Sequence, residues 1–198
     1  MGLFDFLKDV GETILHEAEK EATKRQEFRE RGTGRNVVIA SCPGQAEEAA
    51  GMPFAGQTKS TYEEFAGQMG PEWGRGSAHI LEATERVEYR KKTGRTEATP
   101  AEVRQPENLA RLASQIPADA DNIVALGKNA GIAVDALREA GMLPESARTA
   151  TSRHIGFQGL NQIREDTEGR PLIPGEPGNT QKRVEVVVKE VRHQLDGQ

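Results

Sequence analysis

The chain has 198 residues, which is typical of one domain with short appendages. Its 26 Lys and Arg residues and 31 Asp and Glu residues give a formal net charge of -5, which excludes a protein coated in basic surface but allows a local basic stripe. The single cysteine, Cys42, excludes an internal disulfide and any iron–sulfur or zinc site built from several thiolates, and no cofactor is expected.

An N-terminal helix is predicted from residue 3 to about residue 31, because apolar residues recur there at helical spacing. Its short apolar half and mixed charges favour docking on the protein's own core, while contact with a protein partner or a membrane surface stays open. No apolar stretch approaches a membrane span, and a secretory signal is lacking. We therefore expect a cytoplasmic protein with no membrane partner.

Two apolar runs that end at glycine-containing loops predict buried strands, at residues 37–40 and 122–126. A helix is predicted after each strand, at residues 60–69 and 129–140. Because strand, glycine turn and helix form a βα unit, this repetition indicates an α/β fold. Ligand sites of such folds lie where the strands end.

The region between these units carries weaker signals. Residues 70–76 read as a loop, and residues 78–89 fit neither the helical nor the strand period. Residues 90–96 form a dense basic run, either a solvated turn or a nucleic-acid contact. Thr99 then caps a predicted helix, with Pro100 in its first turn and Glu102 completing a capping box, and Leu109, Leu112 and Ile116 extend the apolar face of this helix.

Three domain segments are expected along the chain. Residues 1–34 hold the N-terminal helix and a linker, and residues 35–168 form the main domain, which includes a short strand and polar loop at 149–161. Residues 169–198 hold a proline-rich exposed linker at 169–178 and a C-terminal element. That element has mixed strand and helix signals, and we favour a helix.

Five ordered segments and one histidine, between residues 36 and 164, resemble the uracil-DNA glycosylase superfamily, particularly its family 4-like branch, although this chain lacks the four iron–sulfur cysteines of family 4. The segments are Ala40-Ser41-Cys42-Pro43-Gly44 with Glu47-Glu48, Gly51-Met52-Pro53-Phe54-Ala55-Gly56, Thr84-Glu85-Arg86-Val87-Glu88-Tyr89, Thr99-Pro100-Ala101-Glu102-Val103, and Ile123-Val124-Ala125-Leu126-Gly127. His154 stands where the family's His-Pro-Ser-Pro motif begins. The resemblance implies a three-layer α/β/α sandwich with a central, mostly parallel sheet.

It also implies a DNA glycosylase, which extrudes a nucleotide from DNA and hydrolyses the bond between sugar and base in base-excision repair. By resemblance, Phe54 stacks on the base and His154 donates to the leaving oxygen, while Ser41 handles water. The backbone amides around Pro43, Gly44 and Gln45, with Cys42 beside them, are then expected to hold the base edge or the water. The DNA phosphates are expected to contact Lys91, Lys92 and Arg95 on one flank, and Arg153, Asn161 and Arg164 on the other.

Two replacements change the expected chemistry. Ser41 stands where the family has a water-activating Glu, and a hydroxyl is a poor base near neutral pH. Glu85 stands where the family has the Asn that reads uracil, and an ionised carboxylate only accepts hydrogen bonds. An acceptor suits an exocyclic amine, as on cytosine or adenine, so a damaged or modified base is expected instead of plain uracil.

Three functions therefore stay open. The first is a glycosylase of altered base specificity. The second is a catalytically inactive descendant of the same fold that binds nucleic acid or a nucleotide. The third is an unrelated α/β enzyme or binding protein.

Overall fold

The computed structural model describes residues 27–197. Most of the predicted N-terminal helix, residues 3–31, lies outside this range. Within it, that prediction is wrong: Arg29–Glu30 forms a strand, β1, which pairs antiparallel with a later strand, and Phe28 is buried in the core. Hydrogen bonds between the backbones of the two strands form here in place of the helical hydrogen bonds that the spacing of the apolar residues favoured.

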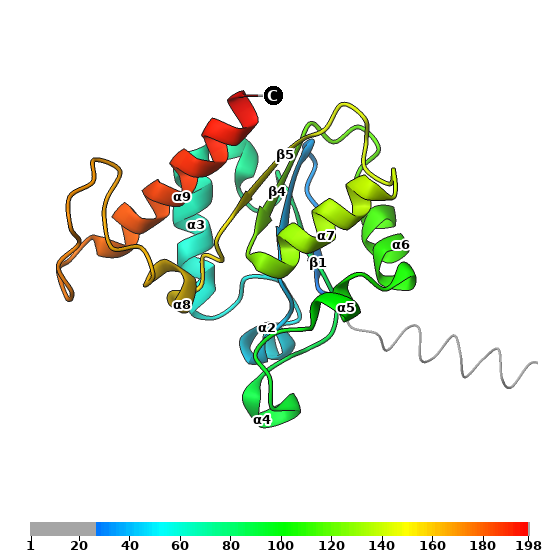
Figure 1. The fold of residues 1–198 in the computed structure, drawn as a ribbon, viewed down its shortest axis with the longest axis horizontal. Coiled ribbons are helices and arrows are strands. Elements are labelled where there is room, and N and C mark those ends of the chain that lie inside the picture. The colour runs from blue at the N-terminus through cyan, green and yellow to red at the C-terminus, as the bar shows by residue number, and fades with distance from the viewer. Residues whose placement is uncertain (1–26, 198) are drawn as a thin grey trace, which may run out of the picture.

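A five-stranded sheet forms the centre of the molecule, in the order β1-β3-β2-β4-β5 (Figure 1). Strands β2 (Asn36–Ala40), β3 (His79–Glu82), β4 (Asn122–Leu126) and β5 (Arg148–Ser152) are parallel to one another. Strand β2 lies between β3 and β4, so the chain reverses its direction of winding there. Ligand sites of open α/β sheets lie at such a position.

Helices cover both faces of the sheet (Figure 1). One face packs against α3 (Gln57–Met69) and α9 (Asn179–Asp196), and the valines of α9 at 184, 187, 188 and 191 belong to that core. The other face packs against α5 (Pro100–Val103), α6 (Pro106–Gln115) and α7 (Lys128–Glu139). The protein is therefore an α/β sandwich around a mostly parallel sheet.

The strands predicted at 37–40 and 122–126 are confirmed, as are the helices at 60–69 and 129–140 and the C-terminal helix. The capping box at Thr99 is also confirmed, but the helix that it opens ends at Val103, and α6 begins at Pro106. Because proline has no N–H to donate and disfavours a helical residue before it, the chain makes two helices here.

Three short helices follow the carboxyl ends of strands: α2 (Gln45–Ala50) comes after β2, α4 (Arg90–Thr93) after β3 and α8 (Phe157–Leu160) after β5. The expected loop at 70–76 contains one 3₁₀ turn, Pro71–Trp73. Residues 169–178 are irregular and exposed apart from Leu172, as predicted. Within residues 27–197, no helix has the length and apolar character to cross a membrane.

Candidate functional site

A cavity of about 750 Å³ opens at the carboxyl edge of the sheet. Each of the four parallel strands contributes a residue from its end: Ser41 after β2, Glu82 on β3, Gly127 after β4 and Ser152 on β5. Its size falls in the range of about 300–1,000 Å³ that is typical of ligand pockets. Cys42, Gly44, Phe54, Arg153 and His154 also line it. The cavity therefore joins side chains more than a hundred positions apart in the chain.

Ser41 has no hydrogen-bond partner for its Oγ atom among the described residues, although the residue is 3% exposed. The neighbouring Gly127 has a φ of 116°, and a Cβ atom at that position would lie 2.5 Å from Ser41 Oγ. Glycine is thus required beside Ser41 both by the backbone conformation and by space. A buried hydroxyl without a partner in a cavity wall is available to a ligand or a water molecule.

Phe54 lines the cavity but is 2% exposed. One face of its ring stacks on Tyr62, with ring centroids 4.8 Å apart and an interplanar angle of 12°. Its φ of 48° is in the left-handed region, which non-glycine residues rarely adopt. Arg75 holds this conformation, because its Nη2 atom donates to the carbonyl oxygens of Pro53 and Phe54 at 3.1 and 2.8 Å and it also pairs with Glu30.

His154 is half-buried and lines the same cavity, next to Gly127. Its Nδ1 atom accepts a hydrogen bond from the backbone N–H of Gly156 at 2.9 Å. Desolvation of the ring lowers the pKa of the imidazole, which favours the neutral form. A neutral ring whose Nδ1 accepts must carry its proton on Nε2, so His154 has one N–H to donate.

Glu85, expected to read the base, does not line this cavity. Its carboxylate lies 3.7 Å from Arg111 Nη1 of α6, on the side of the sheet that carries α5, α6 and α7. The carboxyl group in the cavity is that of Glu82, which is 1% exposed and whose Oε2 atom has no hydrogen-bond partner among the described residues. The strand ends at Glu82, so Glu85 lies beyond it and takes a different direction.

Two further carboxyl groups line the cavity, those of Glu47 and Glu97. Glu47 accepts hydrogen bonds from the backbone N–H groups of Gly44 and Ala55, at 3.1 and 3.0 Å. Glu97, at the exposed rim, accepts from Asn129, and partial desolvation raises the pKa of its carboxyl group while Lys128 opposes this shift. Neither Glu82 nor Glu97 was expected at the site from the sequence.

The other residues expected around the base have different surroundings. Cys42 lines the cavity, and burial is the main cause that raises the pKa of its thiol to about 12, so Cys42 is not a thiolate nucleophile. Pro43 is buried and Gln45 is exposed, and neither side chain lines the cavity. Of the expected Pro43-Gly44-Gln45 cradle, only Gly44 does so.

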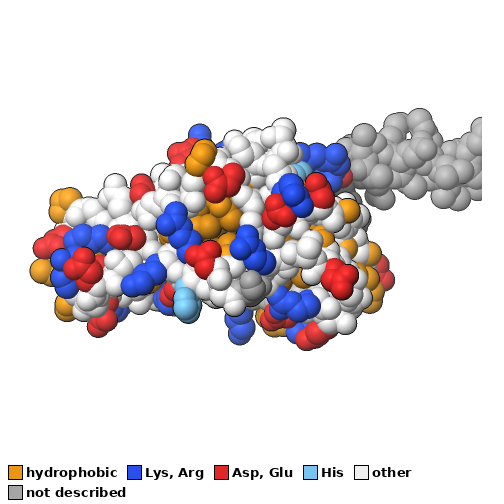
Figure 2. Space-filling model, turned by 90° about the horizontal axis from the view of Figure 1, so that it is seen from above, with side chains coloured by type: hydrophobic (Ala, Val, Ile, Leu, Met, Phe, Trp, Pro, Cys, Tyr) orange, Lys and Arg blue, Asp and Glu red, His pale blue; other side chains and the backbone are white. Residues whose placement is uncertain are grey.

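Most of the cations expected to contact DNA already have anionic partners. Lys92 pairs with Glu48, and Arg95 pairs with both Glu88 and Glu102. Arg153 Nη2 lies 3.7 Å from Glu190, and Asn161 accepts a hydrogen bond from Arg183 at 2.7 Å. Lys91 and Arg164 are exposed, and neither lines the cavity. Basic and acidic side chains are also interspersed on the face shown in Figure 2.

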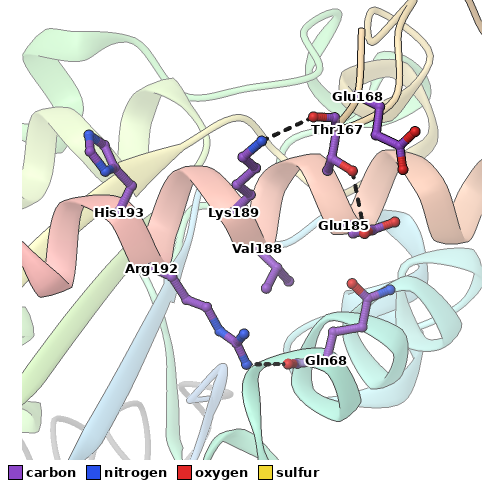
Figure 3. A pocket seen from close by; sticks show the side chains of 8 residues that line it. All are labelled: Gln68, Thr167, Glu168, Glu185, Val188, Lys189, Arg192 and His193. Atoms are coloured by element: carbon purple, nitrogen blue, oxygen red, sulfur yellow. Dashed lines mark hydrogen bonds between the residues drawn. The ribbon is translucent and has the colours of Figure 1, made fainter. Parts of the chain in front are cut away.

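A second hollow, of about 820 Å³, lies between α9, the end of α3 and residues 167–168 (Figure 3). Its cations are held by backbone carbonyl groups: Lys189 donates to Thr167 at 3.0 Å and Arg192 donates to Gln68 at 2.7 Å. None of the predicted site residues lines this hollow. The candidate functional site is therefore the cavity at the strand ends.

Within residues 27–197, no group of three or more His, Cys, Asp and Glu side chains could hold a metal ion. Comparison of the sequence with models of known protein families finds no match, and no curated protein matches it either.

Proposed function

We propose that the cavity at the strand ends takes up one extruded nucleobase and that the protein is a divergent DNA glycosylase, with the uracil-DNA glycosylase-like fold that its sequence motifs resemble. The observation that carries the proposal is that Ser41, Phe54 and His154 lie around one cavity, although they come from widely separated parts of the chain. The cavity is large enough for a base with its sugar, and it offers an aromatic wall and several hydrogen-bonding groups.

The reaction requires that the bond between C1′ and the base nitrogen breaks with its electron pair moving onto the base. His154 donates a hydrogen bond from its Nε2–H to the base as negative charge develops there. A neutral imidazole can do so because its Nε2 atom carries the proton while Nδ1 accepts from Gly156. A water molecule adds to C1′, and its proton passes to a carboxylate. Because Ser41 cannot accept that proton, it orients the water, and Glu47 or Glu97 is the base.

A second candidate is a protein that binds a nucleobase or nucleotide without cleaving it. The pairing of Lys92, Arg95 and Arg153 with carboxylates favours this alternative, because few free cations remain near the cavity to hold a DNA backbone. The replacement of the family's acid by Ser41 also favours it.

An abasic-site assay separates the two candidates. The full chain is incubated with single- and double-stranded oligonucleotides that carry cytosine, 5-methylcytosine, adenine, uracil or hypoxanthine. A glycosylase forms abasic sites with at least one base, and His154→Ala lowers the rate about 10²- to 10³-fold. His193→Ala, which changes an exposed histidine outside the cavity, is the control. Salt-sensitive binding without product for any base supports the second candidate.

A further inference from the structure

The carboxyl group of Glu82 is buried, and its surroundings do not supply the hydrogen-bond partners that it needs. Glu82 pairs with Ala40 across the parallel strands β3 and β2, and the small side chain of Ala40 leaves the space that the cavity occupies. Arg111 donates to the backbone carbonyl of Glu82 at 3.0 Å, while its ion pair is with Glu85. Glu82 Oε2 therefore has no hydrogen bond within residues 27–197, and no ion pair to the Glu82 carboxyl group occurs there.

Burial, together with the nearby charge of Glu47, raises the pKa of Glu82 well above its ordinary value. This shift, at a buried carboxyl group without an ion pair among the described residues, favours the uncharged acid, which has one O–H donor and one carbonyl acceptor side by side. Leaving such a group without partners costs free energy, and a ligand that supplies both partners recovers it. A flat ligand satisfies this side chain when it presents an acceptor for the O–H and, next to it, a donor for the carbonyl oxygen.

The neighbouring Glu47 determines which ligand atoms fit. It is fixed as a hydrogen-bond acceptor by the backbone N–H groups of Gly44 and Ala55. An amino group placed between the two carboxyl groups can donate one N–H to Glu82 and the other to Glu47. A carbonyl oxygen in the same place faces the lone pairs of Glu47 and is repelled.

We propose that Glu82 selects bases that carry an amino group beside an unprotonated ring nitrogen, as cytosine-type and adenine-type bases do, by donating its O–H to the ring nitrogen and accepting from the amino group. This proposal rests on the proposed function and specifies its substrate class. It moves the base-reading role from Glu85 to Glu82, and it assigns that role to an acid in its neutral form.

The test measures the binding of matched oligonucleotides to the full chain. Each probe is a run of thymines with one central nucleotide, which is cytosine, uracil, adenine or hypoxanthine, and a 2′-fluoro group on that nucleotide slows cleavage. Within the cytosine/uracil pair and the adenine/hypoxanthine pair, only the amino-bearing edge differs. We expect the amino member of one pair to bind about tenfold or more tightly, and which pair does so identifies the ring type.

Three variants test the residue. Glu82→Met, which removes both hydrogen-bonding atoms, weakens the preference to the part that Glu47 alone supplies, whereas Glu82→Gln, which keeps one donor and one acceptor, retains it. Glu85→Gln is the matched control outside the cavity and leaves the preference unchanged. Far-ultraviolet circular dichroism confirms that each variant is folded.

The inference is overturned if both members of each pair bind equally, if the keto member binds more tightly, if Glu82→Met keeps the full preference, or if Glu82→Gln loses it. In these cases base binding in the cavity, on which the proposed function rests, is not contradicted. If the protein binds none of the four probes, both are overturned.

Discussion

Gly127 and Ser41 meet at the carboxyl ends of the adjacent strands β4 and β2, where a Cβ atom on residue 127 would lie 2.5 Å from Ser41 Oγ. This contact fixes the floor of the cavity between the two strands at which the chain reverses its winding. It also connects a backbone requirement, the φ of 116° at Gly127, to the position of a candidate functional hydroxyl.

The first prediction concerns Gly127→Ala. We expect this change to lower the free energy of unfolding by about 1–3 kcal/mol, because alanine is strained at a positive φ and its methyl group displaces Ser41. Urea denaturation measures the effect. Gly67→Ala is the control: Gly67 lies within helix α3, where a Cβ atom meets nothing within 4 Å, so that variant is expected to be about 0.5–1 kcal/mol more stable. Equal stability of the two variants contradicts the close contact.

The second prediction concerns Arg75, which holds the strained backbone of Phe54. Arg75→Gln removes the ion pair with Glu30 and hydrogen bonds to two carbonyl groups, so it should destabilise the fold by about 1–3 kcal/mol. The Phe54 ring is then held less firmly in the cavity wall. The affinity for a base should therefore fall by more than the decrease in the fraction of folded protein accounts for. Arg104→Gln, which breaks an exposed ion pair with Glu139, should change stability by less than about 0.5 kcal/mol. A similar small effect at Arg75 would show that it does not hold Phe54.

The third prediction concerns the pH dependence of stability. The pKa of Glu82 is raised in the folded state, so the folded protein binds this proton more tightly than the unfolded chain, whose glutamates titrate near 4.5. The ionisation of Glu82 therefore costs no stability at low pH, where the group is protonated in both states, and it destabilises the fold increasingly as the pH rises above about 4.5. The groups that act on Glu82 are Glu47 on α2, which strengthens the shift, and Arg111 on α6, which opposes it, while the nearby Cys42 thiol is uncharged near neutral pH.

Glu82→Met should accordingly be more stable than the wild type at pH 7.5 by about 1–3 kcal/mol, and this advantage should shrink as the pH falls towards 4.5. Unfolding in urea at a series of pH values measures it. An advantage that stays constant, or one that grows at acid pH, would mean that Glu82 does not carry a proton in the folded protein.

Local patterns in the sequence predicted the elements whose signals lie close together along the chain. The apolar run that ends at Ser41 and the one that ends at Gly127 each became a buried parallel strand, because continuous apolar residues suit a strand covered on both faces. The cap at Thr99 was recognisable from three residues, but the expected continuation of the same helix to Ile116 was wrong, because Pro106 interrupts it and begins a second helix.

The proposed base-reading role of Glu82 could not be found in this way. Residues 78–89 showed no clear period, so the sequence did not indicate that the strand would end at Glu82 or that Glu85 would turn towards Arg111. A lone acid directly after the apolar pair Ile80 and Leu81 was the one available signal. The pairing of Lys92 with Glu48, 44 positions apart, depends on the folded chain and has no local signature.

The most direct test of base binding is an NMR titration of the ¹⁵N-labelled full chain with an oligonucleotide that carries the preferred base. Binding at the strand ends predicts that the backbone amide signals of Ser41, Gly127 and His154 shift together and saturate, while those of Gln68 and Lys189 at the second hollow do not move. Shifts confined to Gln68 and Lys189, or no shift at Ser41 and His154 at saturating ligand, would contradict a nucleobase site in this cavity.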